Sequence, residues 1–311
     1  MKSVREVYPL TVQSTGVARL RQLLDTPEFI IMPCCFDGIS AKLIQQCGYS
    51  LTFMSGFSVS AARLGLPDTG LISYAEMLDQ GRNICSAVDI PVIGDGDTGY
   101  GNTVNVKRTV HGYIQTGFAG IMIEDQLSPK RCGHTMGKEV VGREDAVRRL
   151  RAVIEARDEA RDRGEDIVIV ARTDALDTHG LSEAIERAKR FVDMGADIIF
   201  IESPGSEEEM HRICIEVGGC QMANILEYGK SPVLPPESLK KIGYKIAAYP
   251  LTLLSSAVYA MREALNDIRE GKRPERILDF SDLQAVVGFP EYDNTLRRLE
   301  GNKQPNVHRK R

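Results

Sequence analysis

Short apolar runs rich in β-branched residues recur along the chain, and amphipathic segments separate them. Runs such as 167–171 and 198–201 are apolar at every position instead of at alternate positions. This pattern is typical of parallel strands that helices cover on the outside. We therefore predict buried parallel strands over residues 29–33, 51–55, 91–95, 120–125, 167–172, 197–202, 221–224 and 245–249.

The segments between these runs have helical periodicity. In the clearest of them, residues 143–163, apolar positions such as Leu150 and Val153 recur at helical spacing. Further helices are predicted over residues 38–47, 74–88, 103–116, 182–194, 207–217 and 252–270. Strands that alternate with helices in this way close into a (β/α)₈ barrel, so we predict an α/β fold of the TIM-barrel class.

No Pro-rich or Ser-rich linker divides the chain, and one barrel of this class needs roughly 250 residues. We therefore assign residues 1–271 to a single catalytic barrel and residues 272–311 to a C-terminal tail. Within the tail, residues 280–287 and 288–292 are expected to form short helices, and the chain from Asn302 onward is expected to be disordered.

Composition narrows the class of partner. The formal net charge of −4 and the sequence pI near 5.8 provide no basic surface for nucleic acid or an anionic membrane. No apolar run is long enough to cross a bilayer, and the first residues lack a secretory apolar core. The 7 cysteines include no CxxC pair, as in a protein with reduced thiols. We expect a cytoplasmic protein that binds a small molecule.

Acidic and polar residues follow the predicted strands directly. Asp95 and Asp97 end the third strand, Glu124 the fourth, and Arg172 the fifth. The carboxyl ends of barrel strands meet at one face, which is where barrel enzymes place their sites. Carboxylates that converge there repel one another unless a hard cation such as Mg²⁺ neutralises them. The alternative is that these acids cap helices or pair with arginines.

The segment 129–138 contains the best candidate for a reactive side chain. Cys132 lies there among basic residues that include Lys130 and His134, and nearby cations lower the pKa of a thiol. We therefore predict that Cys132 acts as an acid or a nucleophile. Zinc binding by Cys132 and His134 is the weaker alternative, because no second ligand pair has a suitable spacing. The remaining cysteines are interpreted as buried apolar residues: Cys34, Cys35, Cys47, Cys85, Cys214 and Cys220.

Three motifs resemble the isocitrate lyase / phosphoenolpyruvate mutase superfamily, and the resemblance covers nearly the whole chain. They are the loop 55–60 with Leu64-Gly65-Leu66-Pro67-Asp68, the strand end Asp95-Gly96-Asp97-Thr98-Gly99, and the lyase-branch signature Lys130-Arg131-Cys132-Gly133-His134. The first matches the family's substrate-backbone loop and the second its metal strand.

The resemblance implies a Mg²⁺ site, which Mn²⁺ can also fill, with Asp95 as the direct ligand and Asp68, Asp97 and Glu124 acting mainly through water. It implies catalytic roles for Cys132, Lys130, His134 and Arg172. It also implies substrate binding by Ser55, Gly56, Phe57, Gly133, Arg172, Glu202 and Asn224. Members of the family form homotetramers that exchange the last barrel helix, which here corresponds to residues 252–270.

The implied activity is cleavage of a 2-hydroxy dicarboxylate to pyruvate and a second carboxylate, with Cys132 protonating the carbanion. Ser255 stands where methylisocitrate lyases carry an arginine, and a tricarboxylate needs that charge. A substrate like 2,3-dimethylmalate is therefore favoured. The alternatives are a 2-methylisocitrate lyase, then an oxaloacetate hydrolase or a carboxyphosphonoenolpyruvate phosphonomutase. A barrel without catalytic activity, whose acids form structural ion pairs, is the competing class.

Overall fold

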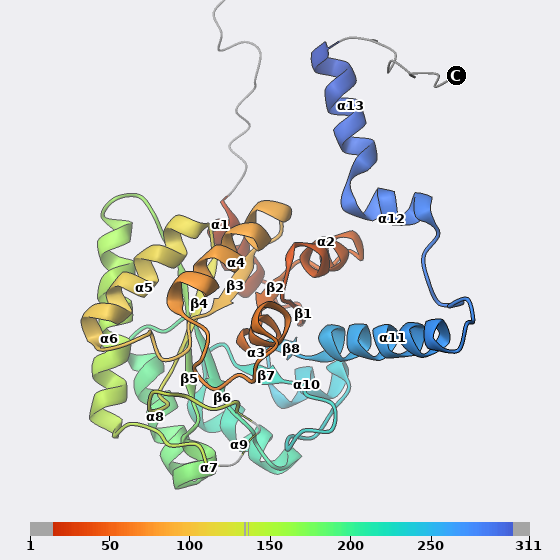
Figure 1. Cartoon of the computed structure of the whole chain (residues 1–311). Helices are drawn as coiled ribbons and strands as arrows, with labels where there is room; N and C mark the ends of the chain where they lie inside the picture. Colours follow the sequence, from red (N-terminus) through yellow and green to blue (C-terminus); the bar gives the residue numbers. More distant parts are fainter. Residues whose placement is uncertain (1–14, 134, 136, 301–311) are drawn as a thin grey trace, which may run out of the picture. The chain divides into compact units, whose positions relative to one another are not determined.

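The computed structural model describes residues 15–133, 135 and 137–300, and the chain divides into two compact units between Ser255 and Ser256. The first unit is built on parallel strands that follow one another in chain order (Figure 1). The described strands are β1 Ile30–Cys35, β2 Thr52–Met54, β3 Val92–Asp95, β4 Gly120–Glu124, β5 Val168–Thr173, β6 Ile198–Ile201, β7 Met222–Asn224 and β8 Ile246–Tyr249.

These strands form a nearly closed barrel. Each strand pairs in parallel with the next along the chain from β1 to β6, and β8 pairs with both β7 and β1. The gap between β6 and β7 is bridged by a single parallel pair, Ile199 with Gln221. The predicted α/β fold with eight parallel strands is therefore confirmed for the described residues.

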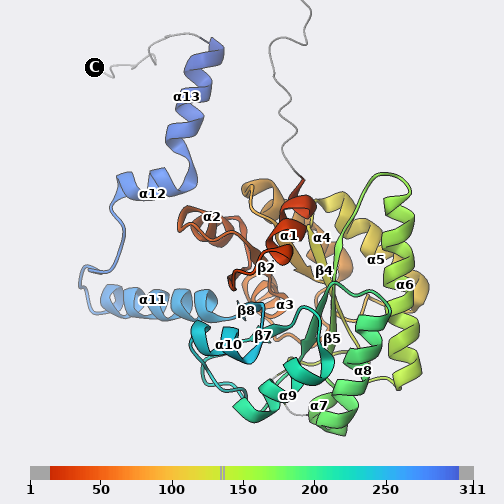
Figure 2. The same ribbon diagram turned by 180° about the vertical axis from the view of Figure 1, so that it is seen from behind.

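Helices surround the barrel on the outside, as the two opposite views show (Figures 1 and 2). In the first unit they are α1 Gly16–Asp25, α2 Gly38–Gln46, α3 Gly56–Val59, the π-helical turn η2 Ser60–Leu64, α4 Tyr74–Ala87, α5 Thr103–Thr116, α6 Arg143–Arg161, α7 Ala175–His179, α8 Leu181–Asp193, α9 Glu207–Val217 and α10 Pro236–Ile242. The sequence pattern did not predict α1, α3, η2, α7 or α10, because most of these segments are too short to show a clear period.

Helix α1 closes the amino end of the barrel. Its Leu20 is fully buried in the cluster that fills the barrel interior. Arg21 forms ion pairs with Asp166 at 2.6 Å and Asp197 at 2.9 Å, and these acids precede β5 and β6. Because the opposite end of the strands is left uncovered by this helix, the carboxyl end is available for a binding pocket.

A buried ion pair joins Arg187 of helix α8 to Asp125, the residue that follows β4. Arg187 of α8 is 2% exposed, and its Nη1 donates to Asp125 Oδ2 and to the carbonyl of Val141, each at 2.8 Å. Asp125 also accepts from Thr173 Oγ1 at 2.6 Å and from the amide of Asp174 at 2.9 Å. Asp125 therefore stabilises the framework of the barrel.

Substituting Arg187→Met is expected to lower the free energy of unfolding by about 3–5 kcal/mol, because Asp125 would remain buried without its cation. Urea denaturation followed by circular dichroism measures the change. Arg190→Met is the matched control: Arg190 pairs with Glu144 at 2.7 Å with its side chain 43% exposed, so its loss should cost under about 1 kcal/mol. Equal effects of the two substitutions would contradict this role of Arg187.

The second unit consists of helices that bury little of their own surface. Helix α11 Thr252–Arg269 begins in the first unit, and α12 Phe280–Val287 and α13 Phe289–Glu300 follow it. None of the three helices contains a buried residue, although their apolar side chains include Tyr259, Met261 and Phe280. No helix within the described ranges is both long and apolar enough to cross a membrane.

Candidate active site

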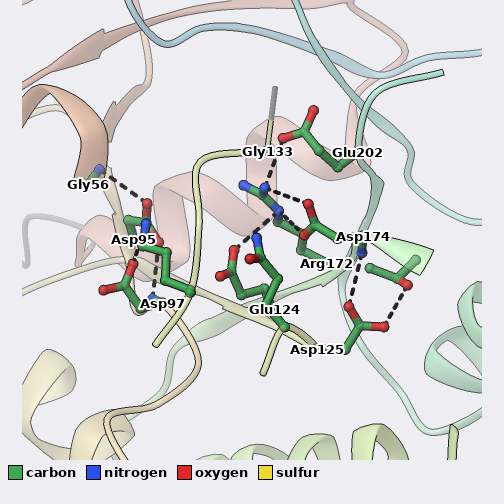
Figure 3. A network of polar contacts seen from close by, with 12 residues as sticks. Gly56, Asp95, Asp97, Glu124, Asp125, Gly133, Arg172, Asp174 and Glu202 are labelled. Carbon is green, nitrogen blue, oxygen red and sulfur yellow. Dashed lines mark hydrogen bonds and ion pairs between the residues drawn. The ribbon is translucent and has the colours of Figure 1, made fainter. Parts of the chain in front are cut away.

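A cluster of buried carboxylates lies at the carboxyl end of β3. Asp68, Asp95 and Asp97 are each at most 6% exposed. Asp95 ends the strand, and its two oxygens accept backbone hydrogen bonds, Oδ2 from Gly56 at 3.1 Å and Oδ1 from Asp97 at 3.1 Å (Figure 3). The loop after β2 and the loop after β3 therefore meet at this one side chain.

Asp97 reaches the cluster in a different way from the one that the sequence suggested. The sequence pattern placed Asp95 and Asp97 together at the end of the third strand. In the structure β3 ends at Asp95, and Asp97 has a positive φ of 47°. A turn, and not strand alternation, therefore brings Asp97 beside Asp95.

Lys130 supplies positive charge to this cluster. Its Nζ lies 2.6 Å from Asp68 Oδ1 and 2.8 Å from Asp97 Oδ1, and the residue is 5% exposed. Burial raises the pKa of Asp97 to about 6, with smaller contributions from Asp95 and Asp68, while the ammonium of Lys130 opposes the shift. One lysine therefore does not fully offset the three carboxylates.

A second cluster of charged side chains surrounds Arg172 near the end of β5. The guanidinium of Arg172 pairs with Asp174 at 2.8 Å, with Glu202 at 3.1 Å and with Glu124 at 3.3 Å (Figure 3). Burial raises the pKa of Glu124 well above its usual range, and Arg172 and Lys130 oppose that shift. The structure thus brings together Glu124, Arg172 and Glu202, three of the residues that the sequence singled out.

The donor set fits a hard divalent cation. Asp68 Oδ1, Asp97 Oδ1 and Glu124 Oε1 are buried and accept no hydrogen bond from the described residues, although the first two lie at ion-pair distance from Lys130. Buried carboxylate oxygens without donors are the ligands that Mg²⁺ prefers. In the described part of the chain, no three His, Cys, Asp or Glu side chains are already arranged as ligands of one ion.

The pocket at this end of the barrel also contains the predicted thiol. Cys132 and Gly133 line it together with Asp68, Asp95, Lys130 and Arg172. A methyl group at Gly133 would lie 2.5 Å from Glu202 Oε2 and 2.6 Å from Arg172 Nη2, so the backbone of this loop packs directly on that ion pair. His134, the other basic candidate of the loop, lies outside the described residues.

Most of the remaining candidates line the same pocket, and Gly56 does not. Ser55 and Phe57 line it, and Ser55 Oγ also caps α3 by accepting from the amide of Ser58 at 3.3 Å. Asn224 lines it as well, and its Nδ2 donates to Glu202 Oε2 at 3.3 Å. The apolar lining residues include Phe57, Leu226, Pro250 and Leu251. The pocket thus joins a charged end to an apolar wall.

Sequence reasoning was only partly right about the cysteines and missed several polar residues. Cys47 is exposed at the end of α2, and Cys85, Cys214 and Cys220 are half-buried, whereas Cys34 and Cys35 are buried and Cys34 lines the pocket. The missed residues are polar and buried around the loop that carries Cys132: Gln126, Lys138 and Ser203. Gln126 and Ser203 closely follow strand ends, and that position could have identified them.

Comparison with known proteins identifies relatives over most of the chain. The sequence profile described as phosphoenolpyruvate phosphomutase matches residues 20–269. A 2,3-dimethylmalate lyase of Eubacterium barkeri is 38% identical over 289 residues, which are 92% of this chain and 97% of the relative. A probable 2-methylisocitrate lyase of Corynebacterium glutamicum is 43% identical over 278 residues, 88% of this chain and 89% of the relative.

Solved structures agree with these sequence matches. The structure of an oxaloacetate acetylhydrolase in complex with the inhibitor 3,3-difluorooxalacetate has a TM-score of 0.89 and 33% identity, covering 93% of this chain and 99% of that one. A phosphonopyruvate hydrolase in complex with oxalate and Mg²⁺ has a TM-score of 0.79 and 28% identity, covering 91% and 98%. These relatives are lyases or related hydrolases and mutases that act on carboxylic acids.

Proposed function

The chain belongs to the phosphoenolpyruvate mutase/isocitrate lyase superfamily, and from this premise we propose that it is a Mg²⁺-dependent carbon–carbon lyase. The proposed substrate is a 2-hydroxy dicarboxylate like 2,3-dimethylmalate, which is cleaved to pyruvate and a carboxylate such as propionate. The observation that carries the proposal is that Cys132 lines the same pocket as Asp68, Asp95 and Arg172.

The cation would be held by Asp95 as the proposed ligand, supported by Asp97 after β3, by Glu124 at the end of β4 and by Asp68 in the segment before α4. When bound, Mg²⁺ polarises the C2 oxygen and the C1 carboxylate of the substrate. Lys130 already contacts Asp68 and Asp97, so it limits the repulsion among these acids when the ion is absent.

Different residues of the pocket would bind different parts of the substrate. Arg172 would bind the C1 carboxylate, and its three acidic partners fix the orientation of its guanidinium. The side-chain hydroxyl of Ser55 and the side-chain amide of Asn224, which both line the pocket, would provide further donors. A base of the pocket would take the proton of the C2 hydroxyl, and the C2–C3 bond would break as the oxygen becomes the ketone of pyruvate. The electron pair left on C3 would then take the proton of the Cys132 thiol, and Lys130 and His134 are the proposed basic groups of that loop.

The apolar wall supports the choice of substrate. Phe57, Leu226 and Leu251 would contact alkyl substituents at C3, and Pro250 offers no hydroxyl that could bind a hydrated ketone. A tricarboxylate such as methylisocitrate carries one more negative charge for the pocket to neutralise. These features favour an alkylated dicarboxylate over methylisocitrate and oxaloacetate.

A panel of three acids tests the proposal. Purified protein with Mg²⁺ should release pyruvate from 2,3-dimethylmalate, which a lactate dehydrogenase couple detects, and EDTA should stop the release until Mg²⁺ or Mn²⁺ is restored. Succinate from methylisocitrate, or oxalate from oxaloacetate, at a higher kcat/KM would reassign the substrate within the superfamily. No product from any of the three acids would refute the proposed activity.

Gly56→Ala provides a test of the carboxylate cluster. A methyl group at this position would lie 2.5 Å from Asp95 Oδ2, so Asp95 must move. Overpacking of this kind costs about 1–3 kcal/mol, which corresponds to a rise of about 5- to 150-fold in the Mg²⁺ concentration needed for half-maximal activity. Gly38→Ala is the control, because its new methyl group would meet Ala87 Cβ at 3.6 Å, an ordinary contact. An unchanged Mg²⁺ requirement in Gly56→Ala would count against Asp95 as the ligand.

We also propose that the chain assembles as a homotetramer in which α11 packs on a second copy. Its exposed apolar residues include Tyr259, Met261, Leu265 and Ile268, each more than half exposed, and such a surface costs free energy in water. Light scattering after size exclusion should give four times the mass of the chain. Met261→Glu with Leu265→Glu should reduce that mass, and a monomeric wild type would contradict the proposal.

A further inference from the structure

The backbone on the amino side of Cys132 is held by a buried glutamine. Gln126 Nε2 donates to the carbonyl of Arg131 at 2.9 Å, and Gln126 Oε1 accepts from the amide of Arg131 at 2.9 Å. The amide nitrogen and the amide oxygen of Gln126 therefore bind both backbone polar groups of Arg131, the residue that precedes Cys132. Gln126 is 0% exposed, so these bonds do not compete with water.

Gln126 is itself fixed by the framework of the barrel. It lies just after β4 and forms an antiparallel bridge with Val140. Arg149 of α6 donates to the carbonyl of Gln126 at 2.9 Å and to that of Glu124 at 2.6 Å. The side chain that holds Arg131 thus extends from a backbone position that Val140 and Arg149 fix to the barrel.

Gly133, the residue that follows Cys132, is also held by hydrogen bonds. The carbonyl of Gly133 accepts from Lys138 Nζ at 2.5 Å and from Ser203 Oγ at 3.2 Å. Lys138 is in turn paired with Asp174 at 3.1 Å and Asp177 at 2.7 Å. Both neighbours of Cys132 are therefore anchored, and the short segment between the anchors has little freedom to move the thiol.

We propose that Gln126 is a positioning residue for Cys132: through the backbone of Arg131 it sets the place of the thiol in the pocket. This inference rests on the proposed function, in which that thiol delivers a proton to carbon. A donor misplaced by about 1 Å can lose about 100-fold in rate, although substrate binding stays intact. Gln126 itself does not line the pocket, and its side chain binds the backbone of Arg131, which does, so its effect on the thiol passes through that backbone.

The test compares Gln126→Met with Gln45→Met. Gln45 is a matched control, because its Oε1 also accepts two backbone bonds, from Asp89 at 2.6 Å and Ile90 at 3.1 Å, and it is absent from the pocket lining. Gln126→Met should lower kcat by about 10- to 100-fold and leave KM within about threefold. Gln45→Met should leave both constants near wild type. Gln126→Asn keeps a buried amide on a shorter side chain, should lower kcat in the same direction, and serves if Gln126→Met does not fold.

A second measurement reports on the thiol without turnover. The rate at which iodoacetamide alkylates Cys132, followed by peptide mass spectrometry, should rise at least about fivefold in the Gln126 variants, because a released loop exposes the sulfur more often. Unchanged kcat and unchanged alkylation in both Gln126 variants would overturn the proposal, and so would an equal loss of kcat in Gln45→Met. If the wild type cleaves none of the three acids, the proposed function fails, and the alkylation rates still decide whether Gln126 positions the thiol.

Discussion

Replacing Cys132 with alanine is expected to lower kcat for 2,3-dimethylmalate by about 10²–10⁴-fold, the usual contribution of a positioned general acid. Cys132 lines the same pocket as Asp95 and Arg172, and alanine has no proton to deliver to the carbanion. Cys132→Ser should be almost as slow, because a hydroxyl is a much weaker acid than a thiol. Steady-state assays with pyruvate detection measure the loss, and thermal unfolding should show the same midpoint as the wild type.

Two other cysteines make this experiment selective. Cys47→Ser is the control, because Cys47 is exposed and does not line the pocket, and it should keep full activity. Cys34 is the competing donor, since it lines the pocket, but burial raises the pKa of its thiol well above the ordinary value. Full activity of Cys132→Ala together with a large loss in Cys34→Ser would transfer the proton-donor role to Cys34.

Replacing Asp95 with alanine is expected to remove turnover and the response to Mg²⁺ together. A bound cation supplies several kcal/mol of stabilisation to the developing charge, so its loss should lower kcat/KM by at least about 10³-fold. Asp95 also accepts the amides of Gly56 and Asp97, so the substitution releases both loops that form this side of the pocket. Calorimetric titration with Mg²⁺ should show binding to the wild type and none to the variant.

Asp79→Ala is the control for that experiment. Asp79 lies on α4, its side chain is 51% exposed, and it pairs with Arg63 at 2.8 Å, so its removal changes the net charge by the same amount outside the pocket. Its Mg²⁺ binding and turnover should match those of the wild type. If Asp95→Ala binds Mg²⁺ as tightly as Asp79→Ala does, Asp95 is not the ligand.

Several features of the fold could be predicted because they depend on local sequence. Strands such as β5 and β6 are apolar on both faces, and only parallel strands under a layer of helices bury both faces. Helix α6 follows an unbroken helical period over 19 residues. Short elements could not be found in this way: α3 spans 4 residues and α7 spans 5, fewer than two helical turns.

The position of the candidate site was also encoded locally, since acids and Arg172 directly follow apolar runs, and the ends of parallel strands meet at one face of a barrel. The local sequence did not encode the roles of the individual side chains in that site. Glu124 and Asp125 are neighbours in the sequence, yet Glu124 pairs with Arg172 while Asp125 pairs with Arg187. The pattern of residues could not show which of these two acids serves the pocket.

The sequence by itself thus determined the order of the strands, the barrel class and the end of the barrel that carries the charged residues, because short-range periodicity and strand ends specify all three. Only the tertiary structure decided the partners within the site. Lys130 meets Asp68 across 62 positions of the chain, and Gln126 holds Arg131 through a turn of the loop after β4. Such contacts depend on how each loop returns over the barrel, and no local pattern of residues records that path.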